Sequence, residues 1–139
     1  MGENSHTYTS VIEAISRGEP DALEGLVARD IVDHNPFPGQ APGIDGFKEW
    51  IRRARSSFPD LKGSVETVVT EGDWVAARVT WRGTHRGEYI GIPATHRSVS
   101  FEAYHMVRFA DGLAAEWWGT ADILGLAEQL GATLRAGSS

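Results

Sequence analysis

The chain has 139 residues and a formal net charge of −6, and it contains no cysteine. This length is typical of one domain with its own core. The absence of cysteine excludes disulfides and cysteine nucleophiles from this sequence, and it fits the reducing cytoplasm, where we expect the protein to lie. The negative charge argues against a nucleic-acid partner, because binding phosphates requires basic patches. No stretch approaches the ~18 apolar residues of a membrane span, so no membrane partner is expected.

Helical periodicity dominates the first half of the chain. Apolar residues recur at helical spacing over 8–15. A second helix is expected over 20–27, because it opens with a proline and Leu23, Leu26 and Val27 form an apolar stripe at helical spacing. A short strand is expected at 30–34, followed by a loop at 36–43 that is rich in proline and glycine. Apolar residues spaced 3 and 4 apart predict a third helix over 44–58.

Strand patterns dominate the second half. Strands are predicted at 65–70, 74–81, 99–109 and 113–120, with turn residues or a long loop between them. A last helix is expected to begin near Asp122. Helices and antiparallel strands segregated in this way indicate an α+β fold. A strongly bent antiparallel sheet wrapped on N-terminal helices would form a cone or barrel, with an internal apolar pocket at its wide end.

Several short motifs occur in order along the chain. They are Asp33-His34-Asn35-Pro36, 43–48, Phe58-Pro59-Asp60, 71–75, 83–88, 91–95, 110–112, Glu116-Trp117-Trp118, Asp122 and 124–131. As an ordered set over roughly residues 8–131, they resemble the SnoaL-like polyketide cyclase family, which has the NTF2-like fold. The set is specific for the family rather than for a substrate.

The resemblance implies one SnoaL-like domain over 1–139, with frayed ends expected at about 1–6 and 135–139. It also implies a homodimer or homotetramer, no cofactor, no metal, and a small hydrophobic substrate of the polyketide type. Characterised members close the last ring of aromatic polyketides by intramolecular aldol condensation. Their acid/base is an aspartate shortly after the last strand's tryptophan, a position that falls on Asp122 here.

Asp122 has two interpretations that are compatible with each other. An aspartate before Ile-Leu-Gly-Leu suits a helix N-cap, which contributes about 1 kcal/mol. If the preceding strand continues, Trp118, Thr120 and Asp122 share one face, and Asp122 projects into the apolar pocket. Such a pocket disfavours the charged carboxylate, which prepares it to take up and return a proton near neutral pH.

His105 is the second candidate catalytic residue, because its position places it on the apolar face of its strand. It is either a hydrogen-bonded core residue or a group that contacts the substrate or Asp122. The adjacent residues Trp117 and Trp118 should face opposite sides of their strand. The candidate substrate contacts are His34, Asn35, Phe37, His85, Tyr89 and Trp118.

Three hypotheses for function remain open. The first is cofactor-independent ring closure by aldol condensation. The second is epoxide opening, ether-ring formation or a ketosteroid-isomerase-like isomerisation; the epoxide chemistry requires an Asp-Arg-Asp set, for which Arg78 and Arg108 are candidates. The third is a ligand-binding domain without catalysis. Metal-ligand spacings, the Gly-x-Ser-x-Gly nucleophile motif and a dinucleotide fingerprint are all absent from the sequence.

Overall fold

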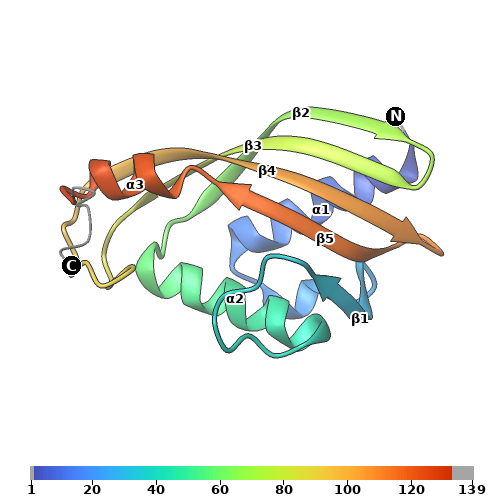
Figure 1. The fold of residues 1–139 in the computed structure, drawn as a ribbon, viewed down its shortest axis with the longest axis horizontal. Helices are drawn as coiled ribbons and strands as arrows, with labels where there is room; N and C mark the ends of the chain where they lie inside the picture. Colours follow the sequence, from blue (N-terminus) through green and yellow to red (C-terminus); the bar gives the residue numbers. More distant parts are fainter. Residues whose placement is uncertain (1, 133–139) are drawn as a thin grey trace, which may run out of the picture.

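The computed structural model describes residues 2–132 and has the predicted α+β architecture (Figure 1). In chain order its elements are α1 (Glu3–Arg17), the 3₁₀ helix η1 (Pro20–Leu23), β1 (Val27–Asp33), α2 (Gly43–Ser57), β2 (Lys62–Glu71), β3 (Trp74–Thr84), β4 (Ser98–Ala110), β5 (Leu113–Ala121) and α3 (Ile123–Gln129). Among these helices, none is long and apolar enough to cross a bilayer.

The five strands form one sheet in the order β1-β5-β4-β3-β2. Strands β2 to β5 are an antiparallel meander, and β1 adds to β5 in parallel. The sheet curls around the helices, with α1 packed on β2 and α2 packed on β1, while α3 follows β5 at one end (Figure 1). The sheet therefore has an inner face towards α1 and α2, and an outer face on the opposite side.

Alternation along the strands separates these two faces as the sequence predicts. In β3, the residues Val75, Val79 and Trp81 are buried on the inner face, and in β4 so are Ala103 and Val107. They pack with the apolar stripes of α1 and α2 in one continuous core. Burial of a side chain of this kind contributes about 1.5–3 kcal/mol relative to exposure, so the core fixes which face each strand residue adopts.

The prediction of an α-helix over residues 20–27 is wrong. The structure has a 3₁₀ turn that ends at Leu23, and Val27 already begins β1. Gly25 between them has φ +83°, a left-handed conformation that interrupts a right-handed helix. Leu23 is nevertheless buried, so the apolar spacing indicated burial correctly but not the secondary structure.

The frayed N-terminus expected over residues 1–6 is also wrong for the part described. Helix α1 begins at Glu3, and Ser5 is fully buried with its hydroxyl donating to the Gly2 carbonyl at 2.8 Å. The frayed C-terminal end expected over 135–139 lies outside the described residues.

Candidate functional site

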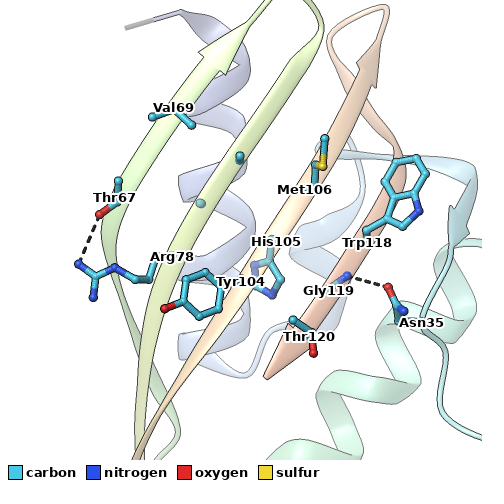
Figure 2. A pocket seen from close by; sticks show the side chains of 12 residues that line it. Asn35, Thr67, Val69, Arg78, Tyr104, His105, Met106, Trp118, Gly119 and Thr120 are labelled. Carbon is cyan, nitrogen blue, oxygen red and sulfur yellow. Dashed lines mark hydrogen bonds between the residues drawn. The ribbon is translucent and has the colours of Figure 1, made fainter. Parts of the chain in front are cut away.

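A hollow of about 570 Å³ lies on the outer face of the sheet (Figure 2). Two cross-strand rows carry most of its side chains: Val69, Ala76, Met106 and Trp118 in one row, and Thr67, Arg78, Tyr104 and Thr120 in the other. Asn35, Ala77, His105 and Gly119 complete the lining. The sequence predicts a pocket between the sheet and the helices, whereas this hollow is open and lies on the opposite face.

His105 is one of the predicted site residues that line the hollow. It lies on β4 with its ring directed to the inner face, where its Nδ1 is 2.6 Å from the Tyr8 hydroxyl. The Trp117 ring lies 5.0 Å from the imidazole, centroid to centroid. Burial lowers the pKa of His105 to about 4, because the apolar surroundings disfavour the charged imidazolium. The imidazole is therefore neutral at physiological pH.

Gly119 lies directly across from His105 in the β4–β5 ladder. A Cβ atom at this position would be 3.0 Å from Cδ2 of His105 and 3.6 Å from its Nε2. Strand β1 ends at Asp33 opposite Trp117, so it does not pair with β5 beyond this point. The Gly119 amide donates to Oδ1 of Asn35 at 2.9 Å instead (Figure 2). His105 thus lies behind a strand edge that carries no side chain at Gly119.

Trp118 lines the hollow on the side next to β1, and His34, which does not line the hollow itself, lies against the Trp118 ring. Their rings stack with centroids 4.0 Å apart and planes 2° apart. Nε2 of His34 is also 3.1 Å from Oε1 of Glu116. Trp117, on the inner face, contacts Tyr8 and His105, so the predicted opposite orientation of the two adjacent tryptophans is confirmed.

Asp122 does not project into an apolar pocket as expected. The chain leaves the strand at Asp122, with φ −76° and ψ 72°, and the exposed side chain caps α3 by accepting from the Gly125 amide at 2.9 Å. The parity argument assumed that β5 continues, and β5 ends one residue earlier at Ala121. The two predicted catalytic residues do not hydrogen-bond each other: His105 bonds Tyr8, and Asp122 bonds Gly125. A catalytic role for Asp122 stays a prediction.

Phe37, His85 and Tyr89 do not line the hollow. Phe37 lies in the loop after β1 with the Arg53 guanidinium 4.3 Å above its ring. His85 is fully buried, and its Nδ1 accepts from the Thr95 amide at 3.2 Å. The Tyr89 ring packs edge-on against Phe58, 5.4 Å away. Substrate contacts by these three residues stay predictions.

No carboxylate is buried among the described residues. Glu102 pairs with Arg78 at 2.8 Å, and Glu116 pairs with Arg108. Neither arginine is hydrogen-bonded to Asp122, so the structure provides no support for the Asp-Arg-Asp set that epoxide chemistry requires. Within residues 2–132 there is also no group of three or more His, Asp or Glu side chains placed to hold a metal ion.

Two residues of this site were missed by the sequence analysis. Tyr8 was identified only as part of a helical stripe, and nothing in its sequence surroundings indicates a partner 97 residues away. Gly119 lies two residues after Trp117 on the same strand, so strand alternation could have placed Gly119 on the inner face with Trp117.

Comparison with known proteins identifies the family. The model of the SnoaL-like polyketide cyclases matches residues 5–130. The chain belongs to this family. It is 34% identical over 138 residues to aklanonic acid methyl ester cyclase AcmA of Streptomyces galilaeus, with 94% of this chain and 92% of AcmA covered. It is 29% identical to aklanonic acid methyl ester cyclase DauD of Streptomyces sp. (strain C5), with 87% and 77% covered.

Solved structures agree with this membership of the SnoaL-like family. The structure of TsrD from Streptomyces laurentii superimposes with a TM-score of 0.88 at 33% sequence identity, covering 94% of this chain and 96% of TsrD. The family match and the relatives that are named cyclases identify the chain as an enzyme of the polyketide cyclase type.

Proposed function

We propose that this SnoaL-like enzyme closes a ring in a polyketide-type substrate by cofactor-independent acid/base chemistry, as an intramolecular aldol condensation in antibiotic biosynthesis. Relatives named as cyclases of aklanonic and nogalonic acid methyl esters support a polyketide acid ester as the substrate class. The observation that carries the proposal is a neutral histidine, His105, set among aromatic side chains beside Gly119, which carries no side chain.

A neutral imidazole suits the electrophilic part of an aldol reaction. The attacked carbonyl oxygen becomes an alkoxide, and a preorganised N–H donor in apolar surroundings stabilises that developing charge. An imidazole with a lowered pKa is neutral at physiological pH and keeps one N–H that can donate to the carbonyl oxygen, as the neutral histidine of triosephosphate isomerase does. His105 meets both conditions, because burial lowers its pKa to about 4.

The base in this proposal is Asp122. It removes a proton from the carbon between two carbonyl groups, and the resulting enolate carbon attacks a separate, nearby carbonyl of the same substrate. The new carbon–carbon bond closes the ring, and the proton held by Asp122 returns to the alkoxide oxygen. Asp122 lies three residues beyond Gly119, which is roughly 10 Å along an extended strand. For both groups to act on one fused-ring substrate, the Asp122 carboxylate has to leave the Gly125 amide and turn towards the sheet.

Asp122→Asn provides a clean test of this role, because asparagine caps a helix as well as aspartate does. We expect the variant to fold normally and bind the methyl ester of aklanonic acid, with turnover reduced by roughly 10²-fold or more. Glu128→Gln, which neutralises another exposed carboxylate of α3, is the matched control and should retain full turnover. Turnover of Asp122→Asn at the wild-type rate would contradict the assignment of the base.

The ring-closure proposal itself is tested with the wild-type enzyme in ¹⁸O-labelled water. Hydrolytic epoxide opening adds an oxygen atom from water, and an aldol closure adds none to the new ring. Binding of the ester without conversion would instead support a ligand-binding domain and contradict the proposal.

We further propose that two copies pair through the outer face. Val69, Tyr104 and Met106 expose 59%, 50% and 50% of their surface there, and monomers rarely leave a contiguous apolar patch of large size uncovered. Pairing would enclose the hollow and exclude water from it. Sedimentation equilibrium tests this pairing directly, and a monomer at micromolar concentration would contradict the pairing.

The cytoplasmic location of the protein stays a prediction.

A further inference from the structure

Tyr8 and His105 form a buried pair between α1 and β4. The Tyr8 hydroxyl lies 2.6 Å from Nδ1 of His105, and Tyr8 exposes none of its surface. The Tyr8 ring stacks on Trp117 with centroids 5.6 Å apart, and Trp117 also contacts the imidazole. Both rings are therefore held in place by aromatic packing as well as by their shared hydrogen bond.

The proton in this hydrogen bond can be assigned from the surroundings. Among the described residues, the Tyr8 hydroxyl has no second hydrogen-bond partner, and its burial keeps it from bulk water. If Nδ1 of His105 carried the proton and donated to Tyr8, the phenolic hydrogen would be buried without an acceptor. Leaving a buried donor unsatisfied is unfavourable, so the hydroxyl donates and Nδ1 accepts.

A neutral imidazole carries one proton, so acceptance at Nδ1 places that proton on Nε2. Among residues 2–132 the His105 ring forms one hydrogen bond, that of Nδ1 with Tyr8, so Nε2 has no partner there. It lies on the side of Gly119, where a Cβ would be 3.6 Å away. Unlike Tyr8, His105 retains partial exposure. Figure 2 shows the imidazole between β4 and β5 on the side of Gly119, with Asn35 on the far side of Gly119.

We propose that Tyr8 is a positioning residue that fixes His105 in the Nε2–H tautomer and directs this N–H to the substrate oxygen beside Gly119. The inference rests on the proposed ring closure for its catalytic consequence. The tautomer assignment is independent of it and is measured without substrate. Burial raises the pKa of the Tyr8 phenol and lowers that of His105, so both partners stay neutral across the physiological range.

Nitrogen NMR of protein labelled with ¹⁵N-histidine tests the tautomer. The five histidines give five sets of ring signals, and loss of one set in His105→Gln assigns His105. We expect a directly bound proton on Nε2 and none on Nδ1 in the wild-type protein at pH 7. In Tyr8→Phe, the Nδ1 signal should shift towards that of a nitrogen with no hydrogen bond. Tyr89→Phe, read only by NMR, is the control and should leave the His105 signals unchanged.

Kinetics test the consequence for catalysis with the methyl ester of aklanonic acid. Tyr8→Phe should lower kcat about tenfold, the effect expected from the loss of one hydrogen bond, with little change in KM. A glutamine at position 105 carries its own N–H donor and has no tautomers, so adding Tyr8→Phe to His105→Gln should not lower kcat further.

The outcomes separate this inference from the proposed function. A proton on Nδ1 of His105 in the wild-type protein would overturn the role of Tyr8, even if the enzyme closes rings. A tenfold further loss in the double variant would also overturn it, because Tyr8 would then act independently of His105. The expected tautomer without any ester conversion would support the pair and contradict the proposed reaction.

Discussion

The His34 imidazole stacks on the Trp118 indole with centroids 4.0 Å apart and ring planes within 2° of parallel. This contact joins the end of β1 to β5 at the point where their backbone pairing stops. Nε2 of His34 is simultaneously 3.1 Å from a carboxylate oxygen of Glu116. The stack thus keeps Trp118 in place as one wall of the hollow while the chain turns into the loop that carries Asn35.

Substitution of His34 should separate the stacking from the charged contact. His34→Phe keeps an aromatic face on Trp118 and loses only the contact with Glu116, so we expect a small change in stability. His34→Ala loses both and should lower the free energy of unfolding by about 1 kcal/mol, a typical value for an aromatic pair. Urea denaturation of the two variants measures this difference. Equal losses in both would show that the stack contributes nothing.

The pH dependence of stability should include a contribution from Glu116. Its pKa is lowered by the hydrogen bond from Arg108 and, to a smaller extent, by that from His34. Because the folded-state pKa lies below the unfolded one, the stabilisation is fully present above the ordinary carboxyl range and is lost as pH falls through the folded value. We expect the difference in Tm between wild type and Glu116→Gln to be largest near pH 6 and to shrink towards pH 3. A difference that stays constant across this range would contradict the assignment.

Much of the fold was predictable because strand alternation is a local signal. The parity of His105 with Ala103 and Val107 placed it on the inner face, and the structure confirms this. Trp117 and Trp118 were separated onto opposite faces by the same rule, which holds as long as a strand remains extended.

Predictions that extended a pattern across a change of backbone direction were wrong. Asp122 continues the alternation of Trp118 and Thr120, but the chain leaves the strand at Asp122, so its side chain does not lie on the same face of the sheet as theirs. Leu26 and Val27 follow Leu23 at helical spacing, but Gly25 adopts a left-handed φ, which interrupts a right-handed helix. The Tyr8–His105 pair belongs to a third class, since only the packing of α1 against the curled sheet brings these two residues together.

His85 should be a strong stabilising residue of the loop between β3 and β4. It is fully buried, its backbone bonds Arg97 and His96, and its Nδ1 accepts from Thr95. His85→Ala leaves a cavity and leaves the Thr95 amide without an acceptor, so we expect a loss of about 2–4 kcal/mol in the free energy of unfolding.

The control is His96→Asn in the same loop, where the residue is exposed with φ +59°. Asparagine tolerates this conformation, so the control should change stability little. A similar loss in both variants would indicate a general weakness of the loop rather than a role for the buried ring.

Gly119→Ala tests whether the room beside His105 is needed for function. The added methyl group would lie 3.0 Å from Cδ2 of the imidazole and 3.3 Å from Nε1 of Trp117, so these rings must shift by a few tenths of an ångström. Gly119 does not have a positive φ, so alanine introduces no backbone strain of the kind that glycine relieves.

We therefore expect Gly119→Ala to change the free energy of unfolding by less than about 1 kcal/mol, because a single methyl group next to a partly exposed ring can be accommodated. In contrast, kcat/KM for the methyl ester of aklanonic acid should fall by roughly tenfold or more, since the methyl group displaces the imidazole that has to direct its N–H to the substrate oxygen. Ala115→Ser adds one heavy atom elsewhere on β5 and is the matched control for both measurements. Wild-type kcat/KM in Gly119→Ala would mean that the substrate does not approach Nε2 of His105 from this side, and the proposed placement of the reacting carbonyl would then be wrong.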